Sequence, residues 1–233
     1  MDERFSRTEV LLGIGAIEKL KNKCVAVFGV GGVGGYCVEA LARSGIGKLV
    51  LIDSDTVHLS NLNRQIIALE KTVGKLKVEA FKERIMQINP NAQVEAIAEF
   101  FTPNNSHLFD FSKYDYVVDA VDTVTAKIEL ALKANESGVP IISSMGAGNK
   151  LDATKFEVAD IYSTSVCPLA RVMRRELTAL GIKKYKVVYS KEEPRKSGVI
   201  DPESGKAIPG SLSFVPSAMG LILAGEIIKD LIK

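Results

Sequence analysis

The stretch KCVAVFGVGGVGGYCVEALARSGIGKLVLID, residues 23–53, decides the fold. Residues 23–28 form an apolar run rich in valine that predicts a buried strand, and residues 48–53 predict a second one. Between them lies a glycine-rich turn, followed by a helical pattern that ends near Ser44 and Gly45. This order is a βαβ unit, and its continuous apolar strands are typical of a parallel sheet covered on both faces.

The glycine turn predicts a nucleotide site. Gly29, Gly31 and Gly34 match the pattern G-x-G-x-x-G, and Gly32 lies within the same turn. Glycines permit a tight turn and a close approach of phosphate to the backbone, while the first N–H groups of the helix attract the anion. Asp53, at the end of the second strand, is placed to accept hydrogen bonds from a ribose. An adenine nucleotide is therefore expected, and helix–strand packing alone is the alternative reason for the glycines.

The rest of the chain continues the alternation of strands and helices. Helices are predicted over residues 76–88 and 123–137, and strands over residues 93–100, 114–122 and 140–146. We therefore expect an α/β fold with a Rossmann-like, doubly wound and mostly parallel sheet and an elaborated C-terminal half.

The composition excludes few functions but limits the setting. The 233 residues are 46% hydrophobic and 25% charged, with a net charge of only +2. Cys24, Cys37 and Cys167 do not have the paired spacing of a structural zinc site, which favours a reduced, cytoplasmic setting. The apolar residues 214–228 are fewer than the roughly 20 that span a bilayer, so a buried helix is expected, with membrane-surface contact as the alternative.

The segment after Asp53 favours a triphosphate over a nicotinamide cofactor. It contains Asp55, Asn61 and Arg64, and Lys77 follows. The planar guanidinium of Arg64 can bind two phosphate oxygens, and Lys77 can place a charge on the α-phosphate during nucleotidyl transfer. Asp55 is expected to assist a metal or to cap the turn before the next helix. The pattern G-x-x-x-x-G-K-[ST] is absent from the sequence, which argues against a P-loop ATPase.

These motifs resemble those of the ubiquitin-activating superfamily. The resemblance rests on RFSR at residues 4–7, on the run from GVGGVGG to NLNRQ at residues 29–65, on GKLKVEA at residues 74–80 and on DAVDT at residues 119–123. It implies an ATP-dependent adenylating enzyme, a ligase that activates a carboxylate by attaching AMP to it.

The resemblance also implies roles for individual residues. Asp53 would bind the ribose, while Asn61, Arg64 and Lys77 would surround the phosphates. Asp122 would organise Mg²⁺ and the attack, and a carboxylate at the carboxyl end of a parallel strand suits that role. Arg7 would reach the nucleotide of a partner subunit, which implies a homodimer.

Within the superfamily, the second half resembles the tRNA threonylcarbamoyladenosine dehydratases, through residues 159–192 and 210–231. The resemblance implies adenylation of the threonyl carboxylate of threonylcarbamoyladenosine in tRNA, followed by cyclisation with loss of water. Residues 1–150 would form the ATP-binding adenylation core, and residues 151–233 an extension of the same domain that faces the tRNA. Relatives also suggest a cysteine desulfurase system as a partner.

Three alternatives stay open. An activator of a ubiquitin-like sulfur carrier protein is the nearest, although such activators usually carry two Cys-x-x-Cys pairs that this sequence lacks. An oxidoreductase would use the same glycine turn for NAD, and a tRNA-binding module would have no ATP turnover.

A basic segment fits an RNA substrate. Residues 171–196 contain nine basic and three acidic residues, with Tyr185 and Tyr189 among them. Cations would contact phosphates and the tyrosines would stack on a splayed base, whereas a solvated charged face is the alternative. The residues assigned to tRNA are Arg171, Arg174, Arg175, Lys183, Lys184 and Lys186.

Three further residues are not assigned to the reaction. Cys167 is interpreted as structural, because the cyclisation needs no cysteine nucleophile. Asp119 fits a structural role as well as a functional one. Lys150 is expected at the surface.

Overall fold

A single seven-stranded sheet organises the molecule. The computed structural model describes residues 2–196, 198–200, 202, 205 and 207–233. The strands are β1 (Cys24–Phe28), β2 (Lys48–Ile52), β3 (Gln93–Ile97), β4 (Tyr116–Asp119), β5 (Ile141–Ser144), β6 (Phe156–Asp160) and β7 (Lys186–Ser190). Their order is β3-β2-β1-β4-β5-β7-β6, and every neighbouring pair is parallel except β6 and β7. The expected doubly wound, mostly parallel α/β fold is therefore confirmed.

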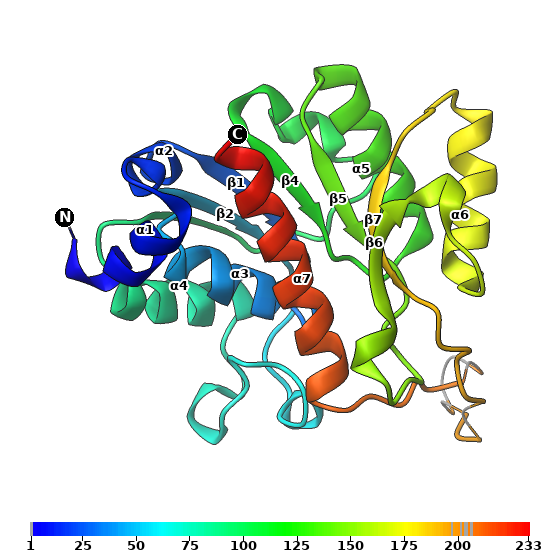
Figure 1. The fold of residues 1–233 in the computed structure, drawn as a ribbon. Helices are drawn as coiled ribbons and strands as arrows, with labels where there is room; N and C mark the ends of the chain where they lie inside the picture. Colours follow the sequence, from blue (N-terminus) through cyan, green and yellow to red (C-terminus); the bar gives the residue numbers. More distant parts are fainter. Residues whose placement is uncertain (1, 197, 201, 203–204, 206) are drawn as a thin grey trace.

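Helices cover both faces of this sheet (Figure 1). They are α1 (Ser6–Leu12), α2 (Ala16–Lys21), α3 (Gly34–Arg43), α4 (Lys77–Ile88), α5 (Val124–Ser137), α6 (Pro168–Ala179) and α7 (Phe214–Leu231). Alternate residues of β1 enter different apolar clusters: Val25 and Val27 pack with α3, α4 and α7, whereas Ala26 and Phe28 pack with α5. The strands are thus buried on both faces, as their continuous apolar sequences predict.

The helix α7 joins the C-terminal end of the chain to the nucleotide-binding half. It lies beside α3 (Figure 1), and a Cβ built at Gly220 would lie 2.2 Å from the carbonyl oxygen of Val33. Only a glycine allows this approach. The helix is the buried one expected over residues 214–228. Within the described residues, no helix has the length and hydropathy needed to cross a membrane.

The sheet has two edges at the ends of its parallel strands. The carboxyl edge is where the parallel strands end, at residues such as Phe28, Ile52 and Asp119. The amino edge is where they begin, and there Lys186 of β7 lies opposite Ile142 of β5. Ligands of open α/β sheets bind outside the carboxyl ends of the strands, so a ligand site is expected at this edge.

Candidate active site at the carboxyl edge of the sheet

In the glycine turn between β1 and α3, some glycines are required by tight packing and others border open space. Gly29 has a φ of +83°, and a Cβ there would lie 2.6 Å from the carbonyl oxygen of Ala120. A Cβ at Gly34 would lie 1.8 Å from the carbonyl oxygen of Gly29. At Gly31, by contrast, the nearest atom is 3.7 Å away. Tight packing therefore explains why residues 29 and 34 are glycines, whereas Gly31 borders open space.

That open space is a cavity of about 390 Å³, a size suited to a small-molecule ligand. The residues assigned to the nucleotide from the sequence border it, with the exception of Gly34, which packs beneath the turn. They are Gly29, Gly31, Gly32, Asp53, Asp55, Asn61, Arg64, Lys77 and Asp122. Gly31 and Gly32 also have backbone N–H groups that donate to no described residue, so they are free to receive an anion.

Asp53, Asp55 and Lys77 form a linked group at the end of β2. Asp53 accepts hydrogen bonds from the backbone N–H of Val30 at 2.8 Å and of Asp55 at 2.9 Å, which ties the glycine turn to β2. Lys77 begins α4 and is only 5% exposed. Its Nζ lies 2.6 Å from Asp55 and 3.9 Å from Asp53. Two carboxylates therefore hold this ammonium at the cavity.

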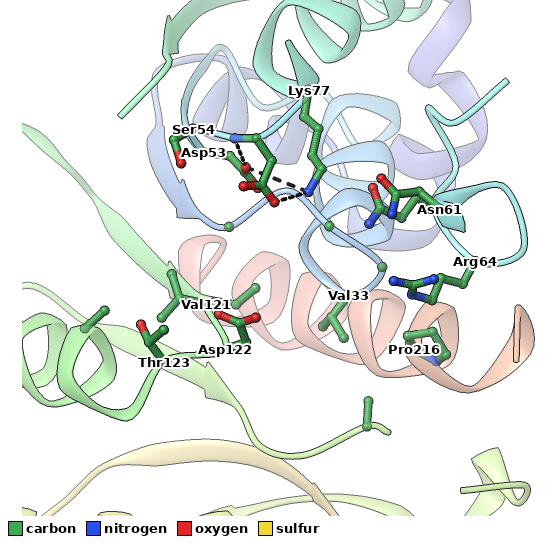
Figure 2. Close-up of a pocket in the computed structure, with 18 of the residues that line it drawn as sticks. Val33, Asp53, Ser54, Asn61, Arg64, Lys77, Val121, Asp122, Thr123 and Pro216 are labelled. Atoms are coloured by element: carbon green, nitrogen blue, oxygen red, sulfur yellow. Dashed lines mark hydrogen bonds and ion pairs between the residues drawn. The ribbon is translucent and has the colours of Figure 1, made fainter. Parts of the chain in front are cut away.

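A second group comes from the segment between β2 and α4. The buried Asn61 accepts a hydrogen bond from the backbone N–H of His58 at 3.0 Å, which fixes the turn. Arg64 donates from Nη1 to the carbonyl oxygen of Ser60 at 2.8 Å, and its Nε and Nη2 donate to no described residue. Figure 2 shows Lys77 and Arg64 both reaching toward the glycine turn. Two cations thus flank the N–H groups of that turn.

Asp122 lies across the glycine turn from Lys77 (Figure 2). It follows β4, and its exposed carboxylate makes no hydrogen bond or ion pair with any described residue. A free carboxylate that faces a phosphate-sized space suits Mg²⁺, which proteins usually bind through one or two carboxylates and substrate phosphates. No group of three or more His, Cys, Asp and Glu side chains with metal-ligand geometry occurs in the described parts of the chain.

Asp119 is fully buried and belongs to the core of the molecule. It accepts hydrogen bonds from Lys127 at 3.0 Å, from Ser143 at 2.5 Å and from Tyr185 at 3.3 Å. Burial, and then the charge of Asp119, raise the pKa of Tyr185 well above its ordinary value. Because these bonds link β4, α5, β5 and the start of β7, the structural role of Asp119 is the one that its environment supports.

The sequence did not identify the remaining walls of the cavity. Ala147 and Gly148 follow β5, while residues 209–211 and Pro216 precede or begin α7. Gly148 packs against Pro209, whose Cβ would lie 3.2 Å from a Cβ at Gly148. The signal was the pair of turns GAG and PG at residues 146–148 and 209–210, which lie far apart in the chain and give no hint that they meet.

The basic segment does not form one surface beside this cavity. Lys186 pairs with Asp230 at 2.6 Å and with Glu226 at 3.4 Å, at the amino edge. Pro216 of α7 lines the cavity, and Asp230 is fourteen residues further along this helix, which corresponds to about 21 Å at 1.5 Å per residue. Lys186 is therefore remote from the cavity.

The other members of the basic segment differ in exposure. Arg174 donates to the carbonyl oxygen of Thr164 at 2.9 Å and is partly buried. The cations of the segment that stay exposed are Arg171, Arg175, Lys183, Lys184, Lys191, Arg195 and Lys196. Tyr185 and Tyr189 are each only 2% exposed, so the expectation that they stack on a base is wrong: their rings pack against α5 and α6.

Arg7 and the cysteines lie away from the cavity of this chain. Arg7 is exposed on α1 and does not line the cavity. Cys24, Cys37 and Cys167 are buried free thiols, and burial raises the pKa of Cys37 far above its usual range. A buried cysteine is a poor nucleophile, in agreement with the structural interpretation of Cys167.

The structure also overturns the expectation that Lys150 lies at the surface. It was expected at the surface but is only 4% exposed. The loop that follows β5 is held against the segment before α7, because Asn149 donates its backbone N–H to the carbonyl oxygen of Gly210 at 2.8 Å. The sequence after a Gly-Ala-Gly turn gave no sign of this coverage.

Known proteins of similar sequence include tRNA-modifying and adenylating enzymes. The tRNA threonylcarbamoyladenosine dehydratase of Bacillus subtilis (strain 168) is 45% identical over 244 aligned residues, which cover 100% of this chain and 96% of the relative. The adenylyltransferase and sulfurtransferase of Vanderwaltozyma polyspora is 35% identical over 151 residues, which cover 64% of this chain and 34% of the relative.

Solved structures of the E. coli tRNA N6-threonylcarbamoyladenosine dehydratase are also similar. Its complex with ATP is 34% identical with a TM-score of 0.90, covering 98% of this chain and 93% of that one, and its complex with AMP has a TM-score of 0.88. The sequence profile of the ThiF family matches residues 5–233. With this match over nearly its whole length, the chain belongs to the ThiF family.

Proposed function

We propose that this protein uses Mg·ATP to adenylate the threonyl carboxylate of threonylcarbamoyladenosine in tRNA and then cyclises it with net loss of water. The observation that carries the proposal is the cavity itself: Arg64 and Lys77 flank free backbone N–H groups of the glycine turn, and the unpaired Asp122 lies opposite. The similarity to a dehydratase along the full chain supports this substrate.

The first step forms an acyl-adenylate. A carboxylate oxygen of the substrate attacks the α-phosphorus of ATP, the bond to the β-phosphate bridging oxygen breaks, and pyrophosphate leaves. Lys77 and Arg64 would stabilise the charge that develops on the phosphates, in a site whose donors are already oriented. When bound at Asp122, Mg²⁺ would neutralise phosphate charge. Asp53 would hold the ribose hydroxyls.

The second step closes the ring. An oxygen of the same modified nucleoside attacks the activated carbonyl carbon, and AMP leaves with the oxygen that the carboxylate loses. Because nucleophile and electrophile belong to one molecule, the step is unimolecular and orientation supplies a large part of the rate. The protein therefore needs no cysteine nucleophile, in agreement with the burial of Cys24, Cys37 and Cys167.

Activation of a ubiquitin-like sulfur carrier is the second candidate. The similarity to the adenylyltransferase and sulfurtransferase favours it, but that similarity covers only 34% of the relative. The sequence also lacks the Cys-x-x-Cys pairs that are usual in such activators. The dehydratase reaction is therefore the better supported of the two functions.

One assay tests the function directly. The purified protein is incubated with Mg·ATP and tRNA that carries threonylcarbamoyladenosine, and the nucleosides are analysed by mass. The expected result is loss of one water, with release of AMP and pyrophosphate. An intact nucleoside, together with adenylation of a sulfur carrier's C-terminal glycine, would favour the second candidate.

A homodimer completes the proposal. Arg7 lies on α1 beside an exposed apolar surface of Val10, Leu11 and Ile14, of which Ile14 is 98% exposed. Apolar groups gathered at one place on the surface are typical of protein interfaces. A second copy of the chain would cover them and bring Arg7 to the partner's nucleotide.

Two measurements test the dimer. Ile14→Glu should fold normally, sediment as a monomer and lose turnover. Mixing inactive Arg7→Ala and Asp122→Asn proteins should restore turnover, since one site of the mixed dimer has both groups. If the mixture stays inactive although mixed dimers form, Arg7 has no role across the interface.

Contact with RNA through α6 stays a prediction. Arg171 and Arg175 are exposed there, and Lys183 and Lys184 follow the helix. Single alanine substitutions at α6 should weaken tRNA binding about evenly across sequences and lower the salt dependence by about one per phosphate contact.

A further inference from the structure

Arg64 packs beside the glycine turn and the start of α7. A Cβ built at Gly32 would lie 3.5 Å from the Cγ of Arg64 and 3.4 Å from the Cβ of Pro216. Figure 2 shows Arg64 beside Pro216, with its guanidinium directed toward the glycine turn. The aliphatic part of the side chain is therefore held by packing, and the direction of its planar head depends on hydrogen bonds.

Two acceptors hold one corner of that guanidinium. Its Nη1 donates to the carbonyl oxygen of Ser60 at 2.8 Å and to Oδ1 of Asn63 at 2.9 Å. Because the group is planar and rigid, a fixed Nη1 also restricts the directions of Nε and Nη2. Neither of these two nitrogens donates to a described residue, so both remain free for an anion at the cavity.

The side chain of Asn63 is itself anchored, although it is exposed. Its Nδ2 donates to the carbonyl oxygen of Ser211 at 3.0 Å, while its Oδ1 accepts from Arg64. A guanidinium can only donate and a carbonyl oxygen can only accept, so one orientation of the amide satisfies both partners. The bond to Ser211 therefore keeps Oδ1 turned toward Arg64.

Ser211 belongs to residues 209–211, which line the cavity before α7 begins. Gly210, the residue before it, accepts from the N–H of Asn149 at 2.8 Å and donates its own N–H to Oδ1 of Asn149 at 2.6 Å. Asn149 follows β5, whereas Asn63 follows β2, and β1 and β4 lie between these strands. The hydrogen bonds that direct Arg64 thus lead to a segment that is bound on both sides of the cavity.

We propose that Asn63 is a positioning residue, which holds the guanidinium of Arg64 against residues 209–211 so that Nε and Nη2 face the triphosphate before ATP binds. This rests on the proposed function, because it takes ATP as the ligand of the cavity. A flexible side chain that is ordered only on binding weakens affinity, and an arginine that is already ordered avoids that loss.

Calorimetric titration with ATP tests the role of Asn63. Asn63→Leu keeps a side chain of similar size and removes both the donor and the acceptor. The matched control is Asn91→Leu, on an exposed asparagine whose side chain makes no hydrogen bond with the described residues. We expect Asn63→Leu to raise the dissociation constant for ATP about three- to tenfold, and Asn91→Leu to leave it near wild type. Both variants should melt within about 2 °C of the wild type, because both side chains are exposed.

A double-mutant cycle shows whether Asn63 acts through Arg64. In an Arg64→Met background, Asn63→Leu should cause no further loss of ATP affinity, because the group that it positions is already gone. If Arg64→Met binds ATP too weakly to measure, Arg64→Lys, which keeps the charge without the planar group, is the background. A loss that stays the same in either background would overturn the proposal, as would wild-type affinity of Asn63→Leu alone. If Asn63→Leu does not fold, Asn63→Ser is measured in the same way.

The same titrations keep this role apart from the function on which it rests. If the wild-type protein does not bind ATP, the proposed function fails whatever Asn63 does. If the wild-type protein binds ATP and Asn63→Leu binds it equally well, only the role of Asn63 fails.

Discussion

The two edges of the sheet differ in whether all of their charged groups are paired. At the amino edge, Asp230 accepts hydrogen bonds from Tyr116 at 2.9 Å, from Lys186 at 2.6 Å and from Lys233 at 2.8 Å. At the carboxyl edge, Asp53 and Asp55 hold Lys77, but Asp122 finds no partner among the described residues and part of Arg64 donates to none. Charged groups whose partners lie within the protein stabilise the fold, whereas charged groups without such partners can bind a ligand. The comparison therefore assigns stability to one edge and chemistry to the other.

The largest effect should come from the free carboxylate at the carboxyl edge. Asp122→Asn should lower ATP-dependent turnover about 100- to 1,000-fold, because it removes the proposed metal ligand opposite the phosphates. Its melting temperature should not change, since the carboxylate holds no described residue in place. Turnover and thermal unfolding of the same preparation check this. Near wild-type turnover would remove Asp122 from the reaction.

Two substitutions within the glycine turn should have different effects, one on folding and the other on ATP binding. Gly34→Ala should lower the free energy of unfolding by about 3 kcal/mol, because its Cβ would lie 1.8 Å from the carbonyl oxygen of Gly29. Gly31→Ala, with its nearest atom at 3.7 Å, should fold normally but bind ATP about tenfold more weakly. Urea unfolding and calorimetric titration with ATP measure the two. Equal stability of both variants would contradict the division of the turn.

The sequence predicted the carboxyl edge better than the rest because its chemistry is local. The spacing of Gly29, Gly31 and Gly34 after an apolar run fixes a strand, a turn and a helix start, and Asp53 follows at the end of the next strand. Such short-range patterns depend on backbone geometry that the residues themselves impose. The fold class and the cavity residues of the glycine turn and of the segment from Asp53 to Lys77 could therefore be predicted from the sequence, whereas the walls after β5 and before α7 could not.

What the sequence missed depends on contacts between distant segments. Lys150 and Gly210 are sixty residues apart, and no local pattern shows that the loop before α7 covers the loop after β5. Tyr185 and Tyr189 alternate with lysines in a way that suits either an RNA surface or a strand with two buried rings. The register of this strand and the strands beside it decide between the two possibilities, and both are properties of the tertiary structure.

A moderate effect is expected from the saturated carboxylate at the amino edge. Burial alone would raise the pKa of Asp230, but hydrogen bonds from Lys186, Lys233 and Tyr116 outweigh it and lower the pKa to about 2, from an ordinary value of 3.8. A lowered pKa means that the charged form stabilises the folded state. This contribution, about 2 kcal/mol, is complete above pH 4 and disappears as the pH falls through about 2.

Asp230→Asn isolates that contribution. At pH 7 it should unfold about 1–2 kcal/mol more readily than the wild type, and the difference should shrink between pH 4 and pH 2. Its turnover at pH 7 should equal that of the wild type, since Asp230 lies about 21 Å along α7 from Pro216 at the cavity. A variant with normal stability and lost turnover would reverse the roles of the two edges.

The smallest effect should come from Lys186, although it belongs to the basic segment. Its ammonium is already bound by Asp230 and Glu226, so an RNA phosphate would have to displace two carboxylates to reach it. Lys186→Met should change the dissociation constant for tRNA less than twofold and leave the salt dependence unaltered. Filter binding at several salt concentrations measures both. A tenfold loss would mean that RNA reaches the amino edge, and the separation of chemistry from stability along the sheet would then have to be abandoned.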